Sequence, residues 1–288
     1  MNRTFVLIRL SLKQLIWQMA RTFGGRKKFS SLLVLLAAAM LIGLSGLYSW
    51  AMIESVPAEL NMLIPLSMLS AAFGLILVFG FYHAQGYLFD FQDYDLLASM
   101  PLTRGQILMS KLVALIAMML IYSAFLTLPM MALFQLRYAM PATFLLYGLI
   151  GQLFLPIVPM SVACLAAVAV RLISSRLKHP VLIRNVLSLG MVIGLMTVMT
   201  LFQGQTGQAQ DLAALIQPIQ TWLAPVYWLP MAMINGNLFA LVKLIGLSSL
   251  VLILFLLLIA PVWNALNQKA RTTPVKAGGK VKLEASSM

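Results

Sequence analysis

The chain has 288 residues, of which 61% are hydrophobic and only 9% are charged, and its mean hydropathy is +0.95. Soluble domains carry roughly 25% charged residues, so this composition excludes an ordinary soluble enzyme, a disordered chain and a disulfide-stabilised scaffold. The net charge is +13, from 20 Lys and Arg against 7 Asp and Glu. Such a charge is typical of nucleic-acid-binding proteins and of membrane proteins with basic cytoplasmic loops, and the positions of the charges distinguish the two.

The first 30 residues are basic and contain no apolar run long enough to cross a membrane. Within residues 3–21, apolar side chains recur at three- and four-residue spacing, with basic and amide side chains on the other face. This pattern predicts an amphipathic helix that lies in the cytoplasmic membrane interface. The helix serves either as an elbow leading into the membrane or as an anchor on anionic lipid.

Six apolar stretches are each long enough to cross the roughly 30 Å of membrane hydrocarbon as a helix. They are residues 31–53, 62–82, 112–135, 143–170, 185–203 and 239–263. Proline removes a helix hydrogen bond, so we expect kinks at Pro129 in the third stretch and at Pro156 and Pro159 in the fourth. The predicted fold is all-α: a polytopic membrane bundle of six transmembrane helices over 31–266, between the amphipathic segment 1–30 and a basic, flexible cytoplasmic tail at 267–288.

The loop between the second and third stretches has the features of two short helices separated by a proline. Asp93 and Asp95 stand where a helix dipole favours acidic residues, and Pro101 ends that helix. Thr103 followed by Gln106 has the spacing of a capping box, which predicts a new helix running into the third span. This elbow is either a docking surface for a cytosolic partner or a structural turn that re-enters the membrane.

Residues 204–236 begin polar and become semi-apolar, with Trp222, Tyr227 and Trp228 flanking two prolines. Aromatic residues at this density are typical of the membrane interface. We therefore predict that residues 212–234 form a pair of short helices that re-enter the membrane or lie in its interface. A seventh full span is the alternative.

The basic residues lie mainly on one side of the predicted spans. Eighteen of the 20 Lys and Arg precede the first span, follow the sixth, or fall in the loops after the second and fourth. By the positive-inside rule, both termini are then cytoplasmic in a protein of the plasma (cytoplasmic) membrane. Because these cations are spread over alternate loops, the sequence also argues against a nucleic-acid partner.

No catalytic or metal-binding pattern is present. A G-x-x-x-x-G-K-[ST] motif is absent, so we expect no ATP hydrolysis by this chain and no cofactor bound to it. The two histidines, His83 and His179, are far apart at predicted span ends, which predicts no metal site.

The spans themselves contain few groups that could couple transport to an ion. None of the seven acidic residues lies well inside a span, and Lys243 can reach the interface, which disfavours an ion-coupled carrier. The mild polar residues Gln152, Ser161 and Thr197 either line a substrate path or hydrogen-bond the helices together.

This layout resembles the type-2 ABC exporter permeases. The local resemblance is YDLLASMPLTRGQILMSKLVA, residues 94–114, which looks like that family's loop of an acidic residue, Leu-Leu, Pro, a small or hydroxyl residue, Arg, then Ile-Leu and Lys. It implies a permease subunit that forms the substrate path of an ATP-driven exporter, is not itself an enzyme, and pairs with a separate ATP-binding cassette subunit that holds the ATP.

The resemblance also implies which residues contact that partner. The coupling loop would consist of Asp93, Asp95, Leu96, Leu97, Met100, Pro101, Thr103, Arg104 and Ile107. The second cytoplasmic contact would consist of Arg176, Lys178 and His179.

The same resemblance implies a homo- or heterodimer of permease halves surrounded by membrane lipid. Some members of the family are twice as long, with two fused halves, and the basic tail fits the linker of one such half. Two other classes stay open: a non-transporting integral membrane protein of assembly or sensing, and an ion-coupled secondary carrier.

Overall fold

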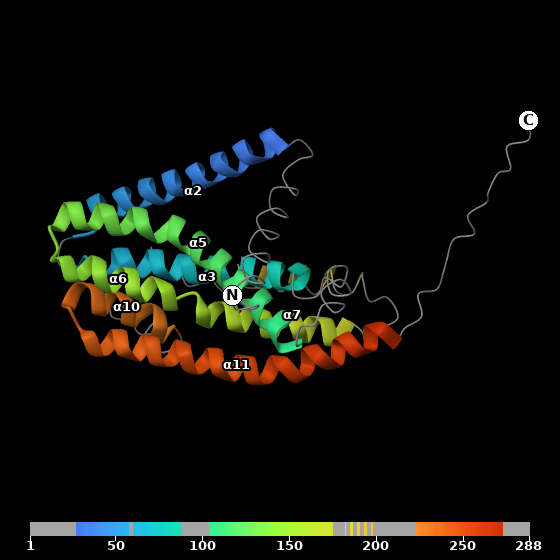
Figure 1. Cartoon of the computed structure of the whole chain (residues 1–288). Coiled ribbons are helices and arrows are strands. Elements are labelled where there is room, and N and C mark those ends of the chain that lie inside the picture. Colours follow the sequence, from blue (N-terminus) through green and yellow to red (C-terminus); the bar gives the residue numbers. More distant parts are fainter. Residues whose placement is uncertain are drawn as a thin grey trace, which may run out of the picture.

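The computed structural model describes residues 27–57, 60–87, 104–174 and 223–272, together with isolated positions between 182 and 197. All regular structure in these ranges is helical (Figure 1). The predicted amphipathic helix at 3–21, most of the loop before Arg104 and the tail beyond Thr272 lie outside the described residues.

Seven labelled helices form the described structure, and the colours of Figure 1 follow their order in the chain. They are α2 (Lys27–Ser55), α3 (Leu63–Tyr87), α5 (Arg104–Tyr138), α6 (Ala142–Phe154), α7 (Ile157–Ser174), α10 (Ala224–Asn235) and α11 (Leu238–Thr272).

Four helical segments of the described chain are long and apolar enough to cross a membrane: Leu63–Tyr87, Gly105–Tyr138, Ala142–Ser174 and Leu238–Ile259. They coincide with the second, third, fourth and sixth predicted spans and confirm that the protein is apolar enough to be embedded in a membrane. The first and fifth spans stay predictions, because α2 is not among the four and residues 185–203 fall largely outside the described chain.

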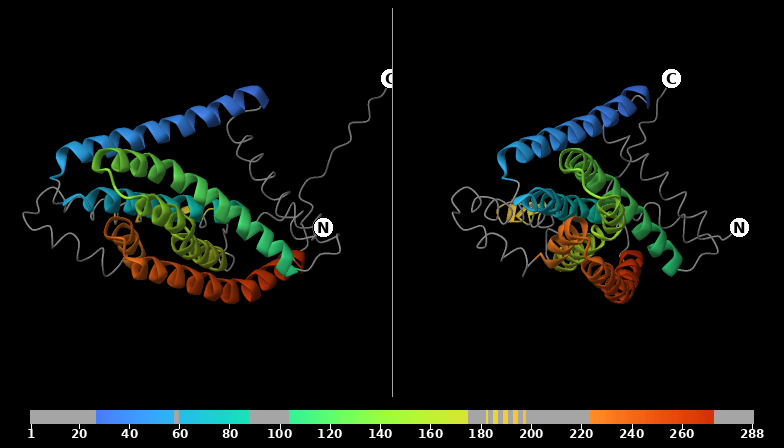
Figure 2. Two further views of the ribbon diagram at one scale, coloured as in Figure 1. Left: turned by 60° about the vertical axis from the view of Figure 1, so that its left-hand side comes forward. Right: turned by 90° about the vertical axis from the view of Figure 1, so that its left-hand side faces the viewer.

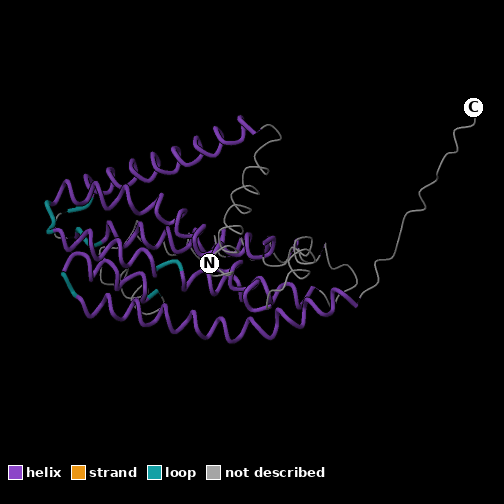
Figure 3. Tube along the Cα trace, in the orientation of Figure 1, coloured by secondary structure: helices purple, strands orange, loops and turns teal. Residues whose placement is uncertain are grey.

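The long helices alternate in direction, so the bundle has two distinct ends. One end, here called the turn end, holds the connections α2–α3, α5–α6 and α10–α11 (Figure 3). At the opposite end α3, α7 and α11 finish and α5 begins, as two further views show (Figure 2). We call it the basic end, because Arg104, Arg171, Lys269 and Arg271 lie in the helix ends that gather there.

The fourth predicted span is interrupted at the place where its prolines predict a kink. Residues 155 and 156 separate α6 from α7, and the break is visible as a loop within the bundle (Figure 3). Pro156 and Pro159 have no N–H, so the carbonyl groups of Gln152 and Leu155 lose the donors that an unbroken helix would supply. Pro129 alone removes one such bond, and α5 continues through it.

The apolar core divides into two clusters along the bundle. The basic-end cluster joins α3, α5, α7 and α11 through residues such as Phe81, Leu112, Met119, Ala167 and Phe255. The turn-end cluster joins the other halves of α3, α5 and α11 to α6, α10 and the last turn of α2, through residues such as Ile64, Phe134, Phe144, Leu229 and Leu244. α2 buries only Ser45, Ser49 and Ile53 among its described side chains, and it leans away from the bundle toward Lys27 (Figures 1 and 2).

The segment before the sixth span contains a short helix. α10 has 12 residues, which corresponds to about 18 Å at 1.5 Å per residue, too short for a seventh span. It contacts α6, α11 and α3 at the turn end. Gly236 ends it in the left-handed conformation (φ 62°), which glycine adopts without steric cost, and Asn237 then caps α11 through its side-chain oxygen. Residues 212–222, the first part of the predicted pair, lie outside the described chain.

Candidate functional site

The predicted coupling loop leaves and re-enters the bundle at its basic end. Within the described residues α3 runs to Tyr87 and α5 runs from Arg104, and the helix start that the capping-box spacing predicts at Thr103 lies outside them. Seven predicted contact residues lie outside the described chain: Asp93, Asp95, Leu96, Leu97, Met100, Pro101 and Thr103.

Ile107 is buried in the bundle, whereas a docking residue is expected to be exposed. Its side chain is 1% exposed and packs in the basic-end cluster, so it has no surface to offer a partner. The same helical turn exposes Met109 instead, at 43%. The physical reason is that Ile107 lies on the face of α5 that packs in the basic-end cluster, together with Phe81 and Tyr87 of α3.

The second predicted contact also starts from the basic end. α7 finishes there at Ser174, and Arg176, Lys178 and His179 lie outside the described chain. Both predicted contact segments are therefore tethered to the same end of the bundle.

A layer of buried polar residues lies between the two apolar clusters. It consists of Ser123 and Thr127 on α5, Gln152 on α6 and Ser248 on α11. The Gln152 Nε2 atom donates to Ser123 Oγ at 2.7 Å, and Thr127 Oγ1 donates to the Ser123 carbonyl oxygen at 3.0 Å. This polar layer coincides with the break between α6 and α7, so interrupted backbone and buried polar side chains occur at one depth.

Two atoms of the polar layer have no hydrogen-bond partner among the described residues: Gln152 Oε1 and Ser248 Oγ. Gln152 is 5% exposed and Ser248 is fully buried. Adjacent to them, the carbonyls of Gln152 and Leu155 lack their helical donors. The layer therefore offers uncharged hydrogen-bonding groups, mainly acceptors, to a water molecule or a polar group of a substrate.

The other predicted path residues satisfy their hydroxyl groups within their own helices. Ser161 Oγ donates to the Ile157 carbonyl at 2.7 Å, and Thr197 Oγ1 donates to the Ile193 carbonyl at 2.9 Å. Such bonds to the preceding turn are ordinary for hydroxyl residues in membrane helices. Gln152, by contrast, joins α6 to α5 through Nε2 and retains a buried acceptor, Oε1, with no partner among the described residues.

Other candidate groups lie at the edges of the bundle. The His83 ring stacks on Tyr122 at a centroid distance of 6.1 Å. Lys243, on the exposed side of α11, lies 4.5 Å from the Phe239 ring and 5.9 Å from the Trp228 ring, which agrees with a lysine near the turn-end interface. Within the described residues, no group of three or more His, Cys, Asp or Glu side chains could hold a metal ion.

Lys111 is a residue whose role the sequence did not indicate. Its position before an apolar run suggested a loop cation, but it lies in α5, 4% exposed, with Nζ 3.1 Å from the Tyr87 carbonyl oxygen. The signal was available: a helix that starts after Thr103 carries residue 111 two turns into the bundle.

Comparisons of the chain with protein-family models, with curated proteins and with solved structures gave no match.

Proposed function

We propose that the chain is the membrane permease subunit of an ATP-driven ABC exporter and that it couples to a separate ATP-binding subunit through its basic end. The observation that carries the proposal is that segments 88–103 and 175–181 both depart from one end of a packed helix bundle. A partner that binds at this end reaches both segments at once. By the positive-inside rule, the basic residues of the same end support a cytoplasmic location for it, where ATP is available.

The interior of the bundle favours a transporter powered by ATP hydrolysis in a partner subunit over one powered by an ion gradient. None of the seven acidic residues lies within the four candidate spans, so these spans lack the carboxylates on which ion-coupled carriers commonly depend. The polar layer supplies uncharged groups at mid-bundle, beside a broken helix. Broken helices at this depth are where many transporters place a substrate site, and we assign Gln152 to the substrate path on that basis.

The proposal is tested by isolating the full chain from its native membranes with an affinity tag. We expect an ATP-binding subunit to co-purify, and we expect Leu97→Asp to abolish that co-purification while membrane insertion is unchanged. An acidic side chain in the apolar Leu-Leu pair of the loop would be desolvated without a partner at an interface.

The control variant is Ala139→Asp in the turn between α5 and α6. Ala139 is exposed at the opposite end and has φ 46°, a conformation that aspartate tolerates better than most residues. Ala139→Asp should retain the partner. Equal retention by Leu97→Asp would contradict the coupling role of the loop, and the absence of any ATP-binding protein from the parent preparation would contradict the proposed function.

A further inference from the structure

Lys111 is a buried cation at the basic end of the bundle. It lies within the candidate span Gly105–Tyr138, and its side chain is among the buried polar groups. Burying an ammonium group is costly unless it is paired, and charged residues inside membrane spans usually carry a function. A methionine of similar length would fill the position at lower cost, so the contacts of Lys111 must explain its presence.

Lys111 contacts the last residue of α3. Its Nζ donates to the Tyr87 carbonyl oxygen at 3.1 Å and lies 5.5 Å from the centre of the Tyr87 ring, within cation–π range. A backbone carbonyl oxygen is a strong acceptor, so Tyr87 gives the buried ammonium group of Lys111 a partner on the neighbouring helix.

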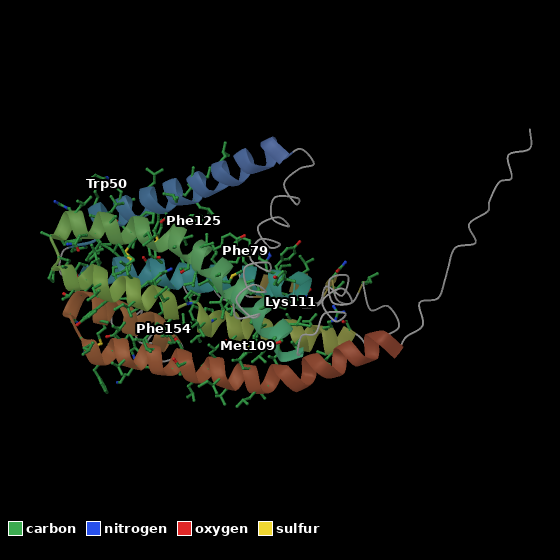
Figure 4. The ribbon with its side chains drawn as sticks, in the orientation of Figure 1. Trp50, Phe79, Met109, Lys111, Phe125 and Phe154 are labelled. Carbon is green, nitrogen blue, oxygen red and sulfur yellow. The ribbon has the colours of Figure 1, made fainter. Side chains whose placement is uncertain are left out.

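The contact joins the two ends of segment 88–103. Tyr87 precedes the segment, and Lys111 lies two turns after the segment returns at Arg104. Around the contact, Ile107, Leu108 and Leu112 are buried in the basic-end cluster with Tyr87. Figure 4 shows Lys111 on α5, toward the end of the bundle where that helix begins.

We propose that Lys111 is a positioning residue that clamps the base of segment 88–103, so that a force on the segment moves α3 and α5 as one unit. The inference rests on the proposed function for the source of that force, the ATP-binding partner. Without the clamp, the same force would separate α3 from α5 at their ends, and less of it would reach the polar layer.

The clamp is tested first without reference to function, by measuring the distance between spin labels on Gly86→Cys and Gly105→Cys in the full chain. Both glycines are exposed, and a Cβ at either one would meet no atom within 4 Å. The single native cysteine, Cys164, is fully buried and should not take up label.

We expect a narrow distance distribution in the parent and in Lys111→Arg, which keeps a charged donor, and a clearly broader one in Lys111→Met. Lys243→Met, which removes an exposed lysine, is the matched control and should leave the distribution unchanged. If Lys111→Met does not accumulate in membranes, Lys111→Gln, which removes the charge, is measured instead with the same expected broadening. A narrow distribution without the lysine would overturn the clamp.

The second measurement is the ATP hydrolysis of the complex purified with its ATP-binding subunit. Lys111→Met should lower the hydrolysis stimulated by the permease about tenfold while co-purification stays at the parental level, and Lys111→Arg should restore it. Full stimulation in Lys111→Met would overturn the coupling role. If no ATP-binding subunit accompanies even the parent chain, the proposed function fails, and the label distances still decide whether Lys111 holds the two helix ends together.

Discussion

Gly151→Ala is expected to loosen the packing of α10 on α6. Gly151 is buried, and an added Cβ would overlap Leu229 Cδ1 of α10 and lie 3.1 Å from Cδ2 and 3.2 Å from Cγ. Leu229 is itself fully buried in the turn-end cluster, so its branched side chain cannot swing into open space. The absence of a side chain at residue 151 is therefore what permits the close approach of the two helices.

The magnitude follows from two opposing terms. Glycine to alanine in a helix interior stabilises by about 0.5–1 kcal/mol through backbone entropy, whereas forced overpacking costs about 1–3 kcal/mol. Gly246→Ala on α11 is the matched control, because a Cβ there meets nothing within 4 Å and only the favourable term applies. The unfolding free energies of the two variants should thus differ by about 1–3 kcal/mol, which corresponds to roughly 2–4 °C in Tm for each kcal/mol.

The protein contains its own reporter for this measurement. Cys164 is the single cysteine and is fully buried, so a thiol-reactive dye should label it only when the bundle opens. The melting temperature of each purified variant in detergent is read from the rise in dye fluorescence.

A double variant isolates the contact itself. In a Leu229→Ala background the obstacle is gone, so Gly151→Ala should cost nothing further. Gly148→Ala should be milder than Gly151→Ala, because the overlapping atoms there are the terminal methyl groups of Met131 and Met233, and methionine side chains adapt easily. Two results would refute this explanation: equal melting temperatures for Gly151→Ala and Gly246→Ala, or an equal loss of stability from Gly151→Ala with and without Leu229.

Two further predictions use the same assay. Gln152→Leu and Ser123→Ala should each lower the free energy of unfolding. Their double-mutant cycle should give a coupling energy of about 0.6 kcal/mol, the average for hydrogen bonds between membrane helices. Zero coupling would mean that the 2.7 Å contact does not hold α5 to α6. Asn237→Ala should cost about 1 kcal/mol, because Asn237 Oδ1 accepts from two backbone N–H groups in the first turn of α11 at 3.0 and 3.2 Å. Asn237→Ser, which keeps a capping oxygen, should recover most of that loss, and equal melting of the two variants would contradict a capping role.

Helix type and several helix boundaries could be predicted from the sequence because they depend on local chemistry. Apolar length alone located the four candidate spans. Pro156 and Pro159 predicted a kink in the fourth span, and the structure interrupts the helix there, between α6 and α7. The decisive groups are the missing N–H groups of the two prolines, which lie within a few residues of their effect.

Pairings between helices could not be predicted, because they depend on which faces meet. The sequence could not distinguish a path-lining glutamine from one that binds helices together, and the structure gives Gln152 a bond to Ser123 through Nε2 and a free Oε1. It likewise could not show that Ile107, a residue inside the predicted coupling motif, faces the core. The spacing of apolar residues predicts that a segment is helical. When a helix is apolar on every face, however, its neighbours decide which face points into the core.

Lys111 shows why the side of a membrane and the depth in it are separate predictions. The positive-inside rule counts cations on each side and predicts a cytoplasmic side for Lys111, but the rule contains no term for how far the cation lies within a helix. Depth depends on the course of the helix, and Lys111 lies about 10 Å along α5 from Arg104, its first described residue, at 1.5 Å per residue. The Tyr87 carbonyl of α3 accepts a hydrogen bond there and offsets part of the cost of burying the charge, so the depth of Lys111 is tied to the packing of α3 against α5, which a count of cations does not contain.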